Sequence, residues 1–305
     1  MKTQPSPVSP KVRIVTTLLA SAAVAGACSH AANGPPPATA ATAEDAEGAG
    51  LLEHHSYHHH GGTTLFISMS LETLGVSPEQ RAVVQKIRDD LDANMEAARA
   101  AEDELVTTLA EGVSASRFDD AKIDAAVVKM TAAATQVDEA SKDALNELHG
   151  ALTPAQRDAL VDKVEAHWAV WRKANVEEAS AATPARRDHD HLAALESELL
   201  LTPEQVSRVR ASLADDMKAV PPLDHERVSV HLRTFGAAFR AASFDARSLT
   251  AAASAADEQI VRWGAVHLVH VVEAMSAVVT PNQRAELAER LHVHATHGAA
   301  ERGAS

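Results

Sequence analysis

The chain has 305 residues, of which 46% are hydrophobic and only 3% aromatic. A hydrophobic core must therefore consist of aliphatic side chains and much alanine, a composition that favours helix because alanine loses no side-chain entropy on becoming helical. The formal net charge of -14 argues against nucleic-acid binding, which needs clustered lysine and arginine. A single cysteine excludes a disulfide framework within one chain.

Residues 1–28 have the three-part pattern of a secretory signal peptide. A basic start precedes the apolar run 14–20, and small residues lead to Cys28. The apolar run is too short for a good membrane span. The segment resembles a bacterial lipoprotein signal, which would make Cys28 the lipidated first residue of the mature chain. The same small residues also fit ordinary signal cleavage, which would release a soluble exported protein.

Residues 29–62 are predicted to form a disordered tether. Its first part, to about residue 50, consists mainly of Ala, Pro, Gly and Thr, and such a segment buries too little apolar surface to offset its ordering entropy. The tether would hold a folded body away from a membrane that the protein contacts only through its N-terminal lipid. We therefore expect a protein of the periplasm or cell envelope, anchored by lipid.

Four segments share one helix-start pattern: Ser or Thr, then Pro, then Gln two residues after the proline. The hydroxyl caps an unpaired helical N–H, the proline is preset for the first helical position, and the glutamine reaches back to complete a capping box. Each cap contributes about 1 kcal/mol. The cap and glutamine pairs are Ser77 and Gln80, Thr153 and Gln156, Thr202 and Gln205, and Thr280 and Gln283.

The spacing of these starts predicts a tandem duplication. Ser77 and Thr153 are 76 residues apart, and Thr202 and Thr280 are 78 apart. Between the starts, Phe118-Asp119 corresponds to Phe244-Asp245 at an offset of 126. The predicted fold is all-α, with two four-helix modules. The predicted boundaries are module 1 at 63–178, a linker at 179–188, module 2 at 189–297 and a disordered tail at 298–305.

Apolar residues at helical spacing define the predicted helices of module 1. A short helix is expected near 63–74, and a long continuous one from Pro78 through Leu109. A third is expected from about Asp119 to Leu148, and a fourth from Pro154 past Trp171. Module 2 repeats this order, with Pro221-Pro222 interrupting its long helix.

The paired helix starts with Phe-Asp between them resemble the Spy/CpxP family of bacterial periplasmic proteins, which carry the LTxxQ motif. The resemblance covers residues 63–297. It implies a thin, curved helical cradle that binds unfolded or partly folded proteins without ATP, as an envelope chaperone or stress protein. Family members form cradles by dimerising, so the chain is expected to act as an intramolecular pseudo-dimer or a homodimer. The pattern assigns no client-binding residue.

The charge of module 1 departs from the basic character associated with these cradles. Residues 64–178 contain 12 Lys and Arg against 22 Asp and Glu, whereas residues 185–302 contain 13 against 16. Long-range attraction would favour cationic clients or metal ions. The alternative is that the acidity only keeps the surface soluble.

Histidine clusters precede both modules and suggest divalent-metal binding. If the first tract is helical, its histidines form i,i+4 pairs that present two imidazoles to one ion, which would be zinc, nickel or copper. The candidate ligands are His54, His55, His58, His59, His60, His189 and His191. A third cluster consists of His292, His294 and His297. Such tracts also bind metal weakly in linkers. A metal sensor or buffer is one alternative function, and a structural lipoprotein that binds another envelope protein is a second.

The sequence gives no sign of an enzyme. It contains no nucleophile elbow, phosphate-binding glycine loop or cysteine pair. His225-Glu226 begins like a zinc-protease helix, but Ser229 stands where the second histidine would be. We therefore expect no catalytic residues and no required cofactor.

Overall fold

The computed structural model describes residues 61–179, 191–249 and 251–302, and side chains in 61–173, 195–249 and 254–296. Cys28, the tract His54 to His60 and His189 lie outside the described residues, and of His191 only the backbone is described. The predictions for these residues therefore remain predictions. No described helix is long and apolar enough to cross a membrane.

The described residues form helices and no strands, which confirms the all-α prediction. The helices are α2 (Gly62–Glu72), α3 (Pro78–Asn94), α4 (Glu96–Ala115), α5 (Asp120–Ala151), α6 (Pro154–Ala179), α7 (His191–Glu198), α8 (Pro203–Asp216), α9 (His225–Arg240), the 3-10 helix η2 (Ala246–Ser248), α10 (Ala251–Ser276) and α11 (Pro281–Arg302). Each proline-marked start falls at the first residue of a helix, as predicted.

The long helix predicted from Pro78 through Leu109 is interrupted, so that prediction was wrong at one residue. Helix α3 ends at Asn94 and α4 begins at Glu96, with the buried Met95 between them. The Arg99 guanidinium donates to the Asp92 carbonyl oxygen (2.8 Å) and so satisfies an acceptor beside the interruption. We call residues 61–179 the first segment and residues 191–302 the second segment. The corresponding interruption in the second segment is larger, because Pro221 and Pro222 separate α8 from α9.

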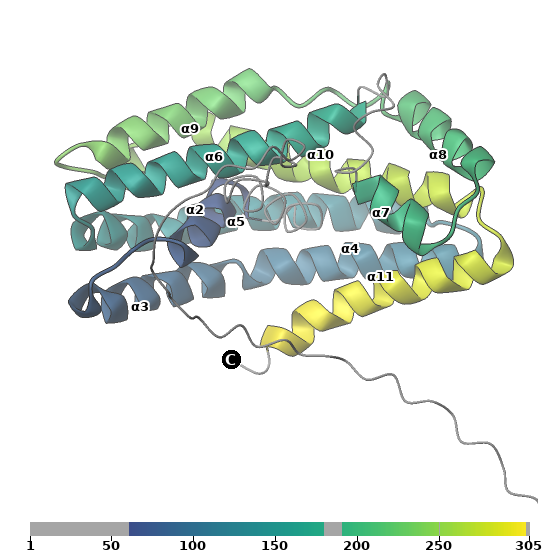
Figure 1. Ribbon diagram of the computed structural model, residues 1–305, viewed down its shortest axis with the longest axis horizontal. Coiled ribbons are helices and arrows are strands. Elements are labelled where there is room, and N and C mark those ends of the chain that lie inside the picture. Colours follow the sequence, from purple (N-terminus) through teal and green to yellow (C-terminus); the bar gives the residue numbers. More distant parts are fainter. Residues whose placement is uncertain (1–60, 180–190, 250, 303–305) are drawn as a thin grey trace, which may run out of the picture. The chain divides into compact units, whose positions relative to one another are not determined.

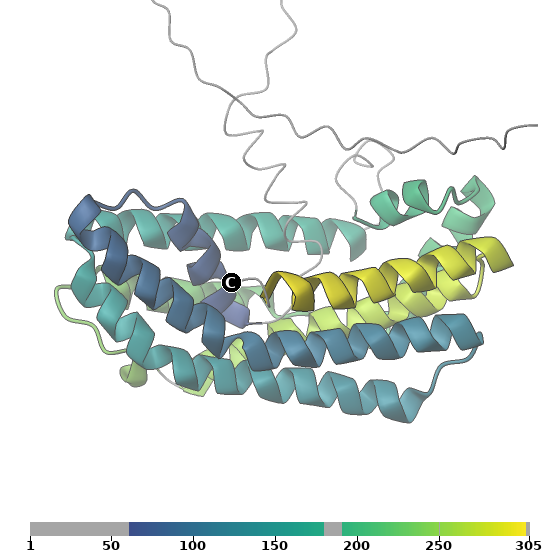
Figure 2. The same ribbon diagram turned by 90° about the horizontal axis from the view of Figure 1, so that it is seen from below.

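Helices from the two predicted modules pack against each other in a repeated pattern. Helix α5 packs along α10, α4 along α11, and α9 along α6 (Figures 1 and 2). Helix α4, which follows α3 in the first segment, lies on α11, the last helix of the second segment. Helix α9, which follows α8 in the second segment, lies on α6, the last helix of the first segment. The boundaries of the two modules remain predictions, but neither predicted module forms a core of its own among the described helices.

Two hydrophobic cores result, and each contains helices from both segments. The aromatic core contains α2, α3, α6 and the C-terminal half of α5, together with α9 and the N-terminal half of α10. The aliphatic core contains α7, α8, α11 and the C-terminal half of α10, together with α4 and the N-terminal half of α5. The two cores are thus built from corresponding helices. The first segment supplies most helices of the aromatic core, and the second segment supplies most helices of the aliphatic core.

The two cores differ in the size of their side chains. Seven of the eight described Trp and Phe residues lie in or against the aromatic core; they are Phe66, Trp168, Trp171, Phe235, Phe239, Phe244 and Trp263. Phe239 is fully buried and packs within 5.3 Å, between ring centroids, of Phe235, Phe244 and the His149 imidazole. At an offset of 126, Phe235 and Phe239 correspond to Leu109 and Val113 of the aliphatic core.

The shared cores predict that the helical body unfolds as one unit. Urea unfolding of the mature chain, residues 28–305, should give coincident transitions by far-ultraviolet circular dichroism and tryptophan fluorescence. Residues 63–178 alone should not form a stable monomer, because α4 would lose α11 and α6 would lose α9. A stably folded, monomeric 63–178 fragment would contradict this prediction.

Candidate functional site: paired motif glutamines and a buried carboxylate

The glutamines of the first two helix starts pair with each other. Gln80 Nε2 donates to Gln156 Oε1 (2.7 Å), and Gln156 Nε2 donates to Gln80 Oε1 (2.8 Å). Each amide also donates to a carbonyl oxygen of the chain that precedes the other start, Gln80 to Ala151 and Gln156 to Gly75, both at 2.9 Å. We call this arrangement the first glutamine clamp.

The second pair of starts repeats the arrangement. Gln205 Nε2 donates to Gln283 Oε1 (2.9 Å) and to the Val278 carbonyl oxygen (3.0 Å). Gln283 Nε2 donates to the carbonyl oxygens of Leu199 (3.0 Å) and Leu200 (3.3 Å). This second glutamine clamp therefore joins the starts of α8 and α11.

The predicted capping boxes are present as well. In both α3 and α8 the N-cap hydroxyl accepts from the backbone N–H of the glutamine, and the glutamine oxygen accepts from the N–H of the cap. Thr153 with Gln156 and Thr280 with Gln283 make the same two bonds. Each glutamine thus satisfies its own helix start and holds a second one, so the motif is a structural clamp.

Sequence reasoning found the eight clamp residues but missed that the glutamines pair across helices. The near-equal spacings of 76 and 78 residues were the available signal, because a motif that recurs twice per module suggests that its copies meet. Spacing alone, however, does not place two helix starts side by side.

Substitution of a clamp glutamine should destabilise the protein. Gln80→Ala removes bonds to Gln156, Ala151 and the Ser77 cap, and should lower the free energy of unfolding by about 1–3 kcal/mol. The Gln80→Ala/Gln156→Ala double variant should cost less than the sum of the single variants, because the two residues share the same bonds. Urea denaturation measures all three. Gln85→Ala, on the exposed face of α3, is the matched control and should change stability by less than about 0.5 kcal/mol.

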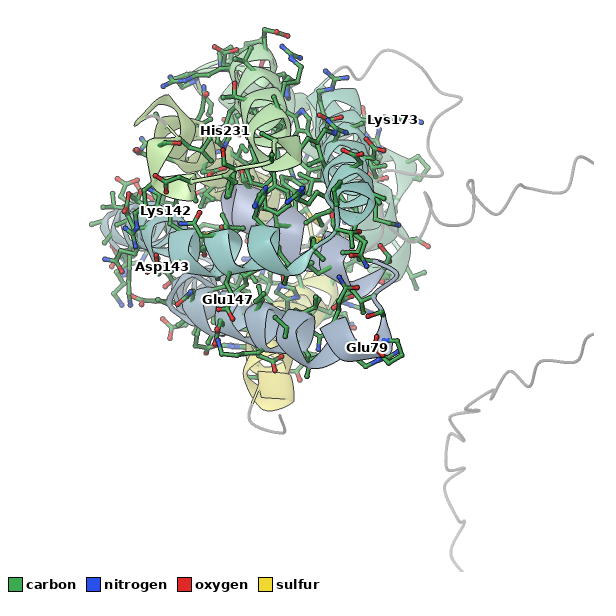
Figure 3. All side chains as sticks on the ribbon, turned by 90° about the vertical axis from the view of Figure 1, so that its left-hand side faces the viewer. Glu79, Lys142, Asp143, Glu147, Lys173 and His231 are labelled. Carbon is green, nitrogen blue, oxygen red and sulfur yellow. The ribbon has the colours of Figure 1, made fainter. Side chains whose placement is uncertain are left out.

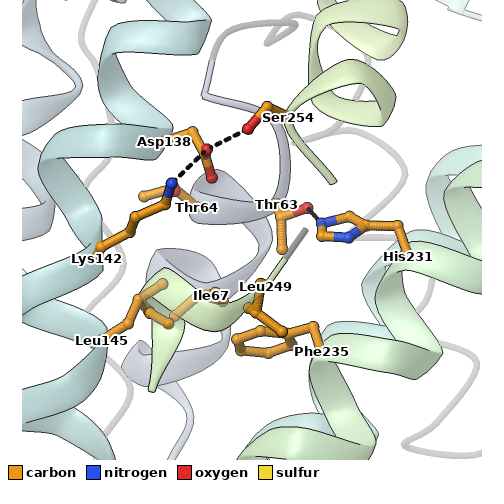
Figure 4. A pocket seen from close by; sticks show the side chains of 11 residues that line it. Thr63, Thr64, Ile67, Asp138, Lys142, Leu145, His231, Phe235, Leu249 and Ser254 are labelled. Carbon is orange, nitrogen blue, oxygen red and sulfur yellow. Dashed lines mark hydrogen bonds and ion pairs between the residues drawn. The ribbon is translucent and has the colours of Figure 1, made fainter. Parts of the chain in front are cut away.

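A buried polar cluster of Thr63, His231 and Asp257 joins the start of α2 to the second segment, and Figure 4 shows its Thr63–His231 contact. Asp257 of α10 is 3% exposed and accepts from the Thr63 backbone N–H (2.9 Å) and hydroxyl (2.6 Å). The Thr63 hydroxyl in turn lies 3.2 Å from His231 Nε2 of α9. Since the hydroxyl proton goes to Asp257, the imidazole is the donor in that contact.

Asp257 acts as the cap of α2 from another part of the chain. The N-cap residue of α2, Gly61, offers no side-chain cap, so the Asp257 carboxylate satisfies a helical N–H that α2 cannot satisfy itself. Gly62 has φ +49° and lies so close that an added Cβ would be 2.7 Å from the Asp257 carboxyl group. Glycine at this position therefore permits both the backbone conformation and the contact.

The pocket beside this cluster is too small for an organic substrate. It is lined by Thr63, Thr64, Ile67, Asp138, Lys142, Leu145, His231, Phe235, Ala246, Leu249 and Ser254. The space open to a water-sized molecule is about 20 Å³, room for roughly one water. Ser254 Oγ donates to Asp138 (2.8 Å), whose carboxylate pairs with Lys142 (3.6 Å).

Burial raises the pKa of Asp257, while the His231 imidazole and the bonds from Thr63 act in the opposite direction. A raised pKa means that the folded protein binds this proton more tightly than the unfolded chain does. Between the ordinary aspartate pKa and the raised value, Asp257 therefore makes stability fall as pH rises. Asp257→Asn should remove that part of the fall, as measured by thermal unfolding over a pH series. Asp89→Asn, on the surface of α3, should keep the wild-type profile. An Asp257→Asn profile parallel to that of the wild type would contradict the assignment.

Several of the described histidines take part in the packing of the helices. His149 Nε2 donates to the Ala241 carbonyl oxygen (2.9 Å) and its ring stacks on Phe244. Burial, and then the Arg172 charge, lowers the pKa of His225. No group of three or more His, Cys, Asp or Glu that could hold a metal lies among the described side chains. The candidate ligands before the two modules are not among those side chains, and of the third cluster only His292 and His294 are, so metal binding at these clusters stays a prediction.

The described surface shows no concentrated apolar patch and carries many charges. The exposed large apolar side chains lie on four different helices and in the turn after α7; they are Val83, Val128, Leu200, Val230 and Val293. Figure 3 looks onto the aromatic-core end, where Glu79, Asp143 and Glu147 lie at the outer surface. The concave apolar face expected of a cradle is therefore not exposed as a continuous surface in this conformation.

Comparison with known protein families identifies the first segment. Residues 63–163 match the model of the LTXXQ motif family, described as LTXXQ motif family protein. This segment is thus similar to proteins of the LTXXQ motif family. It runs from α2 into α6 and contains the whole first glutamine clamp, which confirms the resemblance for this part of the chain. The duplication in the second segment stays a prediction. Neither the curated proteins nor the solved structures give a match.

Proposed function

We propose that this protein is an ATP-independent chaperone of the cell envelope that binds unfolded or partly folded proteins. The observation that carries the proposal is the LTXXQ family match on a helical body whose segments are interleaved. Proteins of the Spy/CpxP family, which the first segment resembles, act in the envelope without nucleotide.

The packing supports an intramolecular pseudo-dimer. Helix α5 pairs with its counterpart α10, while α4–α11 and α9–α6 are corresponding exchanged pairs. An arrangement that other family members reach by joining two chains can thus be reached here by joining two segments of one chain. A single chain would then be the working unit.

Charge supports a preference for cationic clients. The first segment has ten more acidic than basic residues (22 against 12 within 64–178), and its exposed carboxylates include Glu79, Asp143 and Glu147 (Figure 3). Such a surface attracts positively charged chains over a Debye length of about 8–10 Å at physiological salt. Export through the signal at 1–28 and lipidation at Cys28 would place this surface near the membrane.

An aggregation assay tests the proposal. The mature chain, residues 28–305, is added without nucleotide to a denatured basic test protein and, separately, to a denatured acidic one, and light scattering is followed. Aggregation of both should be suppressed near a one-to-one ratio, more strongly for the basic protein, and the difference should shrink at high salt. An inert acidic protein of similar net charge is the control. Unchanged aggregation of both clients at stoichiometric ratio would reject the chaperone proposal.

A further inference from the structure

The first helices of the two segments occupy unlike positions. Helix α2 is almost entirely buried, with Phe66 and Ile67 at 2% and 0% exposure, and it packs against α3, α5, α6 and α10. Helix α7 is its counterpart, because each precedes the first helix start of its segment. Among the described side chains at α7 and directly after it, Leu195 and Leu199 contact the aliphatic core, while Glu196 and Glu198 pair with Arg210 and Arg290. Among the described side chains of the aliphatic core, none belongs to a short helix enclosed as α2 is.

The last helices of the two segments differ in the same way. Helix α6 anchors itself with Trp168 and Trp171, and Phe66 of α2 packs edge-on against Trp168 (6.2 Å between ring centroids). At an offset of 127, given by Thr153 and Thr280, Trp168 corresponds to Ala295 of α11. With this small side chain, α11 lies directly along α4 in the most extensive helix–helix contact of the described body (Figure 2).

Among the described side chains, α11 nevertheless buries fewer and smaller apolar residues than α6 does. Its buried apolar side chains among those described are Leu287, Ala288 and Ala295. Helix α6 buries Leu160, Val161, Val164, Trp168 and Trp171. Because hydrophobic stabilisation scales with the apolar area removed from water, and each tryptophan buries some 150–250 Å², α11 separates at a lower free-energy cost than α6.

Helix α4 packs on both α11 and α5. Its buried side chains include Ala98, Ala101, Leu105, Leu109 and Val113, all at 0% exposure, together with one carboxylate, Glu102. Release of α11 would uncover part of this largely apolar side of α4. Carboxylates gather at one end of the same core. Burial raises the pKa of Glu273 on α10, opposed by His270, and the charges of Asp120 on α5 and Asp216 on α8 raise it further.

We propose that the side of α4 now covered by α11 is the client-binding groove of this protein, and that it receives a short apolar helix with cationic flanking residues. The proposal rests on the chaperone function proposed above. Helix α2 supports the choice of ligand, because it is an 11-residue apolar helix, GTTLFISMSLE, enclosed by the corresponding helices of the other core. The acidic end of the aliphatic core supports the cationic flank.

In this mechanism α11 is a strap that opens by local unfolding from the rest of the body. A client helix competes with α11 for the face of α4, and its apparent affinity depends on the fraction of protein in which α11 is released. The second glutamine clamp controls that fraction, since Gln283 holds the start of α11 to Gln205, Leu199 and Leu200.

A peptide of the sequence Gly62 to Glu72 with two added lysines is the probe, and the protein is the mature chain. Bound peptide should increase hydrogen exchange at α11 amides and leave exchange in α6 unchanged. Gln283→Ala should bind the peptide at least about fivefold more tightly than the wild type, because loss of the clamp bonds raises the released fraction. Gln156→Ala, which opens the first clamp at the start of α6, is the matched control and should bind as the wild type does.

Arg290→Ala provides a second variant if Gln283→Ala does not fold, since it removes the ion pair between α11 and Glu198 (2.6 Å) and should act in the same direction. Equal affinity of the α11 variants and Gln156→Ala, no binding of the peptide, or binding without increased exchange in α11 would each overturn the proposed groove. Suppressed aggregation by the wild type in those cases would leave the chaperone proposal standing with its site elsewhere. Peptide binding with release of α11, but without suppressed aggregation, would keep the groove and reject the chaperone function.

Discussion

The exchange of helices between the two segments is the constraint on which the rest of this structure depends. Neither segment can bury its apolar faces alone, because the second part of each long helix lies on the last helix of the other segment. Helices α5 and α10 cross from one core into the other and so connect them. A small separate module has a large surface relative to the volume that it encloses, and so buries a smaller fraction of its apolar side chains. By sharing helices, the two segments of this aromatic-poor chain enclose two larger cores.

The two cores use the same plan with side chains of different size, and the difference has structural consequences. Where the aromatic core has Trp168 and Phe239, the aliphatic core has Ala295 and Val113 at corresponding positions. Large rings keep α6 spaced and accommodate α2 as an internal helix, whereas small residues let α11 close on α4. A rigid half and a half that opens more easily can therefore coexist in one body, which suits a protein proposed to bind varied clients without an energy source.

The polar contacts of the helical body lie where the packing needs them. The glutamine clamps satisfy carbonyl groups at helix ends that would otherwise lack partners, and Asp257 caps a helix that has no cap of its own. Unpaired polar groups in such positions would be costly. The two Phe-Asp pairs repeat one arrangement within the chain. Asp119 caps α5 and Asp245 caps η2, while Phe118 packs against the aliphatic core and Phe244 against the aromatic core.

The sequence by itself determined the all-α class, the helix starts and the eight cap and glutamine residues. Helix caps and N-terminal prolines favour a helix start through contacts within a few residues, so their spacing in the sequence is enough to locate it. The interruption at Met95 was missed, because no proline or glycine marks it. The meeting of Gln80 with Gln156, of Thr63 with Asp257 and of α4 with α11 joins residues 76 or more positions apart, and no local preference specifies such pairs. Only the tertiary structure decided that apolar faces on one segment would be covered by the other, since hydrophobic burial is non-directional and is satisfied by whichever helix fits.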